Sequence, residues 1–220
     1  MPHPSTPLVL LHAAGRGPAM WRPQVELFST DFRVLTPSLG DTDLDAGFSV
    51  PVAADRIGTA IAEDPAGRAM VCGISLGAMV ALQLAVDHPE RVSALILSGG
   101  QARPNRALLA VNYALLNLLP KRAIVFDGGS RRALLNSYRS LFGWGLLGRL
   151  GEVHAPTLVL CGGRDRANLS AARQLAVGIA GARLEVVPGA GHLWNVSDAD
   201  RFSAVVGDFC RQLPGLGGGR

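Results

Sequence analysis

The stretch that decides the fold is AMVCGISLGAMVALQLAVD, residues 69–87. Four apolar residues lead into Gly73-Ile74-Ser75-Leu76-Gly77, and a run with helical spacing continues to Asp87. A continuous apolar run is typical of a strand in a parallel sheet that is buried on both faces. The sequence therefore predicts a buried strand that turns sharply into a helix at Ser75.

The motif G-x-S-x-G alone is weak evidence, because about 0.2 matches are expected by chance in a chain of this composition. The strand before it and the helix after it make the match specific. A side chain at position 73 or 77 is expected to clash with the neighbouring strand and helix. Ser75 would then have a strained backbone at the carboxyl edge of the sheet, at a helix N-terminus. Such a serine is typical of a nucleophile, and the alternative is a Ser-Gly turn that caps the helix.

Short apolar strands and longer helices alternate along the rest of the chain. This pattern predicts an α/β fold with a mostly parallel sheet covered by helices on both faces. The predicted strands are 8–11, 33–35, 69–72, 92–97, 157–161 and 184–187. The predicted helices are 52–63, 76–87, 107–119, 131–150 (broken around its glycines), 170–179 and 200–213. Residues 1–100 and 153–220 are expected to form one core domain, which residues 101–152 interrupt.

Residues 101–152 differ from the rest of the chain in charge and in apolar content. They contain eight basic and two acidic residues, whereas the remainder contains thirteen basic and fifteen acidic residues. The segment ALLAVNYALLNLL at 107–119 is apolar on almost all sides, and a helix of that kind must be covered. We expect a helical lid over a pocket, and a core helix is the alternative.

The composition excludes several classes of protein. Hydrophobic residues make up 48% and charged residues 17% of the 220 residues, which excludes a disordered chain or a coiled coil. No apolar run reaches the roughly 18 residues of a membrane span, and the first four residues do not resemble a signal peptide. The net charge is +4, but the sequence has no basic run with interleaved aromatic residues. We therefore do not expect nucleic acid as a partner. The three cysteines lack metal-site spacing, so we expect a cytoplasmic protein with reduced thiols and no metal site built from them.

A serine hydroxyl needs a base to take its proton, and the sequence offers five histidines. His192 is the preferred base, because it lies in a flexible loop, residues 188–192, after the last predicted strand. From such a loop its side chain can reach the carboxyl edge of the sheet. The other four are less well placed for this role: His3, His12, His88 and His154.

The base in turn needs a carboxylate that fixes its tautomer and stabilises the imidazolium. Asp165 follows the predicted strand 157–161 after a short turn, and the order Ser75, Asp165, His192 is the one expected for this fold. The alternative is that Asp165 is a loop acid paired with Arg164 or Arg166.

Two backbone amides must point at one position to stabilise an oxyanion. The first is expected from Leu76, the residue after the nucleophile. The second is expected from the loop of small residues after the first strand, where Ala14 is the preferred donor and Ala13 its rival. His12 is expected to shape this loop by hydrogen bonding rather than to transfer protons.

These residues together resemble the α/β-hydrolase superfamily over residues 8–209. The likeness rests on the elbow at 73–77, on DHPERV at 87–92, on APTLV at 155–159 and on PGAGH at 188–192. Residues 72–92 look most like the enol-lactonase and small carboxylesterase branch. The resemblance implies the α/β-hydrolase fold with a short helical lid, and ester-type hydrolysis through a Ser-His-Asp triad without a cofactor.

The chain also departs from the family pattern. Ala13 stands where a second glycine is usual, residues 37–41 replace the common Pro-Gly-His-Gly loop, and the Glu-x-Pro stretch after the base is absent. By this resemblance the first predicted strand is the family's third, so the antiparallel edge hairpin is expected to be missing.

The predicted function is hydrolysis of an ester, lactone or thioester of a small, partly apolar molecule. Two rivals stay open: a lyase, cyclase or isomerase in which His192 acts as a base on carbon, and an inactive homologue that only binds a ligand. Ordinary packing between lid and body is the alternative role for most of the side chains expected to line the pocket, which are His12, Ala13, Leu115, Leu119, Trp144 and Trp194.

Overall fold

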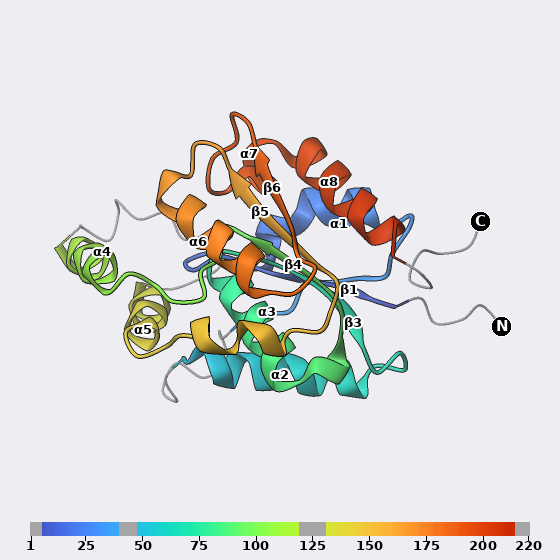
Figure 1. Ribbon diagram of the computed structural model, residues 1–220, viewed down its shortest axis with the longest axis horizontal. Coiled ribbons are helices and arrows are strands. Elements are labelled where there is room, and N and C mark those ends of the chain that lie inside the picture. The colour runs from blue at the N-terminus through green and yellow to red at the C-terminus, as the bar shows by residue number, and fades with distance from the viewer. Residues whose placement is uncertain (1–5, 40–47, 119–130, 214–220) are drawn as a thin grey trace.

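A six-stranded sheet forms the centre of the computed structural model, which describes residues 6–39, 48–118 and 131–213 (Figure 1). The strands are β1 (Leu8–Leu11), β2 (Val34–Leu35), β3 (Ala69–Ile74), β4 (Val92–Ser98), β5 (Thr157–Gly162) and β6 (Arg183–Val187). Their order is β2-β1-β3-β4-β5-β6, and each of these neighbouring pairs is parallel. The six predicted strands and the parallel sheet are thus confirmed.

Helices follow most of the strands, as the sequence predicts, but their bounds differ in places. They are η1 (Pro18–Trp21), α1 (Arg22–Phe28), α2 (Val50–Glu63), α3 (Leu76–Asp87), η2 (Pro89–Arg91), α4 (Arg106–Leu118), α5 (Arg131–Leu141), η4 (Leu147–Glu152), α6 (Arg166–Gly178), α7 (Trp194–Ser197) and α8 (Ala199–Arg211). Four of these elements, η1, α1, η2 and α7, were not predicted from the sequence, and the helix predicted to begin at residue 170 begins at Arg166 as α6. The predicted helix 131–150 is two elements, α5 and η4, separated by a segment that holds Gly143 and Gly145.

The core has two layers, one on each face of the sheet. Successive side chains of a strand point to opposite faces. In β1 the side chains of Val9 and Leu11 join the cluster with α2, α3 and α6, whereas Leu8 and Leu10 join the cluster with α1, α7 and α8. Figure 1 shows α1 and α8 on one side of the strands and α2 and α3 on the other. This packing explains why the strands are apolar at nearly every position.

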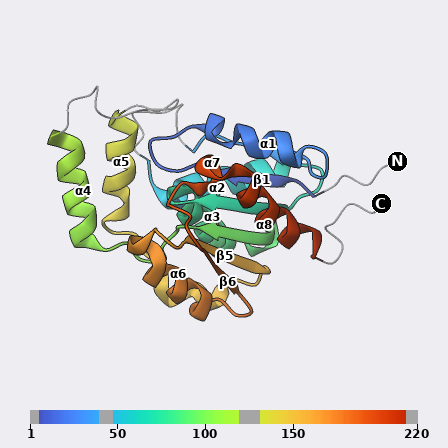
Figure 2. The same cartoon turned by 90° about the horizontal axis from the view of Figure 1, so that it is seen from above.

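Helices α4 and α5 lie side by side at one end of the molecule (Figures 1 and 2). The chain reaches them after β4 and returns through η4 to β5. In α4 only Leu109 is buried, while Leu115 and Leu118 are 52% and 81% exposed. The expectation that this helix is covered all round was therefore wrong for the described residues, because α5 covers only part of its surface. No helix within the described ranges is long and apolar enough to cross a bilayer.

Candidate active site

The turn from β3 into α3 holds Ser75 in a strained conformation. Its φ of 55° and ψ of −115° make it the one residue other than glycine with a positive φ in the described part of the chain. A Cβ at Gly73 would overlap the carbonyl of Gly77, and a Cβ at Gly77 would overlap the carbonyl of Leu11 in β1. The predicted clashes at both glycines are thus confirmed. The turn lifts Ser75 to the carboxyl edge of the sheet, where a bound molecule can meet its hydroxyl.

His192 and Asp165 come together at the same edge. Asp165 follows β5, His192 follows β6, and these strands are neighbours in the sheet. The Nδ1 of His192 lies 2.6 Å from Oδ2 of Asp165, so Nδ1–H donates to the carboxylate and Nε2 is left for other partners. The carboxylate of Asp165 is 7% exposed and the imidazole 38%. A buried acid thus fixes the orientation of a histidine that solvent and ligands can reach.

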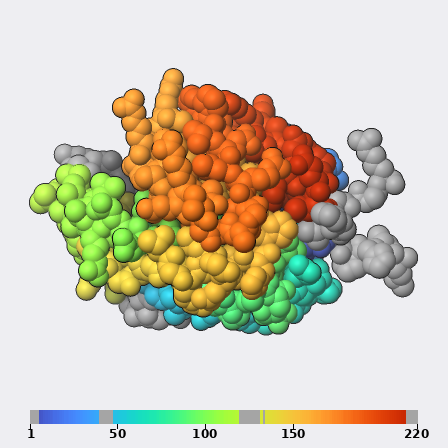
Figure 3. Space-filling view, in the orientation of Figure 1, coloured from blue at the N-terminus to red at the C-terminus, as the bar shows by residue number. Residues whose placement is uncertain are grey.

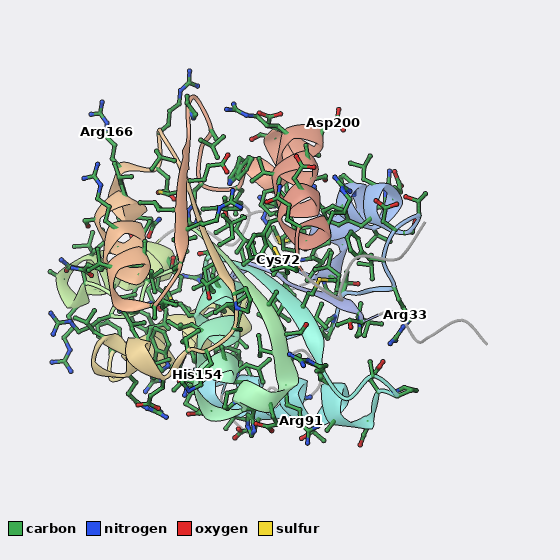
Figure 4. All side chains as sticks on the ribbon, turned by 45° about the vertical axis from the view of Figure 1, so that its right-hand side comes forward. Arg33, Cys72, Arg91, His154, Arg166 and Asp200 are labelled. Atoms are coloured by element: carbon green, nitrogen blue, oxygen red, sulfur yellow. The ribbon has the colours of Figure 1, made fainter. Side chains whose placement is uncertain are left out.

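The alternative pairing of Asp165 with an arginine does not occur. Among the described residues the ion pair of Asp165 is with His192, and neither Arg164 nor Arg166 forms one with it. Figure 4 shows Arg166 pointing outward from α6. Arginine at these positions therefore does not compete for the carboxylate.

The pKa of Asp165 lies below its usual value. Burial by itself raises the pKa of this carboxyl, but the hydrogen bond and charge of His192, together with hydrogen bonds from Asn168, lower it by more. Asp165 therefore remains ionised over the pH range in which a histidine works as a base.

Two residues of this cluster, Asn168 and Gly99, were not singled out from the sequence. The Nδ2 of Asn168 lies 2.9 Å from both carboxylate oxygens of Asp165, and its Oδ1 accepts from Nε2 of Gln101 at 2.6 Å. Asp165 is the N-cap of α6, and the third residue after an N-cap often points back toward it, so a signal for Asn168 was present.

Gly99 allows the backbone after β4 to approach the imidazole. Its φ is +59°, and a Cβ there would lie 3.0 Å from ring atoms of His192 and 3.4 Å from Oδ2 of Asp165. A larger residue would therefore push against the histidine–carboxylate pair. The sequence showed only a strand ending in Ser-Gly-Gly, which does not indicate what the glycine faces.

A cavity of about 160 Å³ opens at this point of the sheet edge, and both Ser75 and His192 line it. None of the described residues that line it is an acid, a lysine or an arginine. Its walls combine apolar side chains with amides and hydroxyls from α4, α5 and α6. The side chains from α4 are Leu108, Leu109 and Asn112, those from α5 are Ser137, Tyr138 and Leu141, and those from α6 are Ala167 and Asn168.

The two expected amide donors border the same cavity. Leu76 is the first residue of α3, and the first amides of a helix have no carbonyl partner within it. Ala14 lines the cavity from the loop after β1, whereas the amide of Ala13 donates to the sulfur of Met20 at 3.4 Å. The geometry therefore favours Ala14 over its rival, because the Ala13 amide is directed into the protein.

The side chain of His12 is a support for this loop. Its Nδ1 donates to the carbonyl of Ala13 at 3.0 Å, and its Nε2 accepts from the amide of Leu39 at 3.1 Å. The ring is 6% exposed and does not line the cavity. The expected loop-shaping hydrogen bonds are present, while the expectation that His12 and Ala13 form the pocket wall is corrected, because both are buried behind it.

Three of the other expected pocket residues lie elsewhere, and a fourth, Leu119, falls outside the described residues. Leu115 points to solvent from the outer face of α4. Trp144 donates its Nε1–H to Oε1 of Gln83 at 2.6 Å and borders a separate groove. Trp194 is fully buried, with its Nε1 3.2 Å from Oγ of Ser98 and its ring against Phe202. Packing between elements, the alternative considered for these side chains, holds for both tryptophans.

Neither His88 nor His154 reaches the cavity, and His3 lies outside the described residues. The Nε2 of His88 lies 2.9 Å from Oδ1 of Asp55, which joins the end of α3 to α2. His154 is exposed in the segment before β5. In the described ranges no three His, Cys, Asp or Glu side chains gather as a metal site would require, and Cys72, Cys161 and Cys210 are free and buried.

Known proteins resemble this chain over nearly its full length. The family described as "Alpha/beta hydrolase family" matches residues 8–205. A protein named "Putative carbamate hydrolase RutD" from Klebsiella pneumoniae subsp. pneumoniae is 28% identical over 94% of this chain and 92% of its own length. The crystal structure of the enol-lactonase from Burkholderia xenovorans LB400 has a TM-score of 0.79 and 26% identity, over 93% of this chain and 91% of that one. A thermophilic esterase from Thermogutta terrifontis has a TM-score of 0.82 over 94% and 90% of the two chains; at 20% identity it supports the fold alone.

Proposed function

The chain belongs to the alpha/beta hydrolase family and has the fold predicted for it, and on that premise we propose that it is a serine hydrolase. The proposed substrates are small esters, lactones or thioesters that are neutral and partly apolar around the reacting carbonyl. The observation that carries the proposal is one cavity that Ser75 and His192 both line, with Asp165 hydrogen-bonded behind the histidine.

The proposed first half-reaction acylates Ser75. His192 takes the proton of the Ser75 hydroxyl through Nε2 as the oxygen attacks the carbonyl carbon. The amides of Leu76 and Ala14 hold the negative oxygen of the tetrahedral intermediate. The intermediate then collapses, and His192 gives its proton to the leaving alcohol or thiol. Throughout, Asp165 holds the imidazole and stabilises its positive charge.

The second half-reaction frees the acid and restores the enzyme. His192 takes a proton from a water molecule, whose oxygen attacks the acyl carbon. The second tetrahedral intermediate uses the same two amides, and the proton passes to the oxygen of Ser75 as the acyl–oxygen bond breaks. The pKa of Asp165 supports this scheme, because a carboxylate ionised at neutral pH can stabilise the imidazolium in both halves.

We further propose that α4 and α5 act as a lid. Side chains from both helices line the cavity opposite Ser75. A volume of about 160 Å³ corresponds to the share of about five water molecules in the liquid, so the part of the substrate that enters is small. Amide and hydroxyl groups among the lining residues can bind a neutral polar acyl group, whereas a carboxylate in the cavity would meet no arginine or lysine among the described residues.

The test is a panel of p-nitrophenyl esters, simple lactones and acyl thioesters, assayed with the parent and with Ser75→Ala. We expect turnover by the parent and a loss on the order of 10⁴-fold or more in the variant. Ser29→Ala is the matched control, because Ser29 is exposed on the far side of the sheet and bonds only locally.

Mass spectrometry after a short incubation with a p-nitrophenyl ester checks for the acyl-enzyme on Ser75. Equal activity in parent and Ser75→Ala would overturn the proposal. Labelling of Ser75 by a fluorophosphonate without any turnover of the panel would instead favour a lyase or isomerase that uses the same base.

A further inference from the structure

A second hollow adjoins the active-site cavity. It is a groove of about 720 Å³ between the start of α4, the segment 142–145 and α6. Figure 3 shows the green surface of α4 beside the orange surface of α6 at this end of the molecule. The groove and the cavity share five lining residues, Gln101, Pro104, Asn105, Leu108 and Ala167. A molecule bound at Ser75 can therefore extend from the cavity into the groove.

The groove differs from the cavity in charge. Two arginines, Arg103 and Arg106, line it, and no acidic residue within the described ranges does. The cavity, by contrast, is lined by no arginine, lysine or acidic residue in the described part of the chain. A substrate that matches both hollows is therefore neutral near the reacting carbonyl and negative at its far end.

The two arginines are available for a ligand. Arg106 donates from Nε to the carbonyl of Phe142 at 3.1 Å, which fixes the guanidinium and leaves its terminal nitrogens without a partner among the described residues. Arg103 packs its side-chain stem beside Gly145, and within the same ranges it forms no ion pair. Both are exposed.

Other arginines of this region are already engaged. Arg149 binds Asp87 and Glu152, and Arg131 donates to the carbonyls of Leu116 and Asn117. Arg103 and Arg106 differ from them in facing an open groove without a carboxylate. An arginine fork in that position suits the oxygens of a carboxylate or phosphate.

We propose that the groove with Arg103 and Arg106 binds an anionic group of the substrate, a carboxylate or a phosphate, while the scissile carbonyl lies in the cavity. This inference rests on the proposed function and names its substrate class. The substrate is an ester or thioester with its anionic end several bonds from the reacting carbonyl. Hydrolysis releases an acid and an alcohol or thiol, one of which keeps the anionic group.

Two pairs of substrates test the proposal and distinguish the two anions. The first pair compares mono-p-nitrophenyl esters of dicarboxylic acids with neutral p-nitrophenyl alkanoates of equal chain length. The second pair compares an acyl-coenzyme A with the same acyl group on N-acetylcysteamine, a neutral thiol. We expect a higher kcat/KM for the anionic member of one pair. The increase should come from a lower KM, and it should become smaller at high salt.

Arg103→Gln and Arg106→Gln should each reduce that preference by about 3- to 10-fold, with kcat/KM for the neutral member unchanged. Arg103→Lys should restore part of it. Arg139→Gln is the matched control, because this arginine is exposed on α5 and does not line the groove.

Three outcomes would overturn the inference: no preference for either anionic substrate, equal loss on neutral and anionic substrates, or the same loss in Arg139→Gln. The neutral esters separate this failure from failure of the proposed function. If the parent hydrolyses them through Ser75 and shows no anionic preference, only the anion site is wrong. If Ser75→Ala retains the activity of the parent, the proposed function itself fails.

Discussion

At the scale of single residues, the backbone at Ser75 needs support from its surroundings. A positive φ at a residue with a side chain costs of order 1–3 kcal/mol. The Ser75 amide donates to the carbonyl of Ser98 in β4 at 2.9 Å, and its carbonyl accepts from Ala78 and Met79 in α3. These bonds join the turn to the neighbouring strand and to its own helix. The strain is therefore maintained by the sheet, and the serine is held in place before any substrate binds.

Asn168 offers a test of how the carboxylate is kept ionised. Asn168→Ala removes hydrogen bonds that favour the charged form of Asp165, so the pKa of Asp165 in the folded protein should rise. A hydrogen bond to a charged group contributes about 1.5–3 kcal/mol, so the variant should be less stable by roughly that amount at neutral pH. Thermal unfolding at a series of pH values measures the difference.

The sign of the pH dependence follows from the direction of the shift. The folded-state pKa of Asp165 is lowered, so its ionisation stabilises the fold above the unfolded-state pKa of about 3.9 and loses this effect as pH falls through the folded-state pKa. The difference in Tm between parent and Asn168→Ala should therefore shrink below about pH 4. Asn117→Ala, on the exposed part of α4, is the control. A difference independent of pH would show that Asn168 contributes only packing.

At the scale of elements, the segment that carries His192 is more firmly held than its glycines indicate. Arg164 donates its amide to the carbonyl of Ala190 at 2.9 Å, and Arg201 of α8 donates from its side chain to the carbonyl of Pro188 at 3.0 Å. Gln24 of α1 donates to the carbonyl of Asn195 in α7 at 2.8 Å. The description of this loop as flexible is thus corrected: bonds from the acid loop, α8 and α1 fix its course.

The buried ring of Trp194 supports the same segment by packing. Trp194→Ala should destabilise the protein by about 3–5 kcal/mol, because it removes a fully buried ring from between the sheet and Phe202. It should also lower kcat by loosening the segment just after His192. Chemical denaturation and steady-state kinetics measure the two effects.

Trp144→Ala is the matched control, because this partly exposed ring loses one hydrogen bond and less packing. We expect a smaller change in stability from it. Equal losses from both variants would contradict the assignment of Trp194 to the core.

At the scale of the whole molecule, the parallel strand order of the sheet brings the site residues together. The loop with Ala14, the elbow with Ser75, the turn with Asp165 and the segment with His192 follow β1, β3, β5 and β6, and all these strands are parallel members of one sheet. Their carboxyl ends therefore meet at one edge, where ligands bind in sheets of this kind. Helices α4 and α5, from the segment between β4 and β5, line the cavity at the same edge.

The size of the cavity leads to a prediction about chain length. The cavity offers about 160 Å³ and continues into a groove lined by two arginines. The esters p-nitrophenyl acetate and butyrate should therefore be hydrolysed faster than the octanoate, whose apolar tail would lie against charged side chains. Leu109→Ala should shift the optimum toward longer acyl chains, because Leu109 lines the cavity from α4 and is buried. Comparison of kcat/KM across the ester series measures the shift.

Leu115→Ala makes the same change on the same helix, at a side chain that is 52% exposed and does not line the cavity. It should leave the chain-length profile unchanged. A shift in Leu115→Ala equal to that in Leu109→Ala would mean that α4 lies differently over the site when substrate is bound.

The sequence by itself determined the sheet, the elbow and the three residues proposed for catalysis. Buried parallel strands are apolar at every position, and the close approach at the elbow admits only glycine at 73 and 77, so both leave a local pattern. Chain order then separated Asp165 and His192 from other acids and histidines. Such features are readable because each depends on neighbours in the sequence.

Only the tertiary structure decided what surrounds those residues. Gly99 and the groove with Arg103 depend on contacts between segments far apart in the chain, whereas Asn168 lies three residues from Asp165 and left a local signal. The two tryptophans look alike as pocket candidates in the sequence, yet one lies in the core and the other borders a groove. The physical reason is that a large apolar side chain gains by burial anywhere, so its identity does not tell which interior surface it covers.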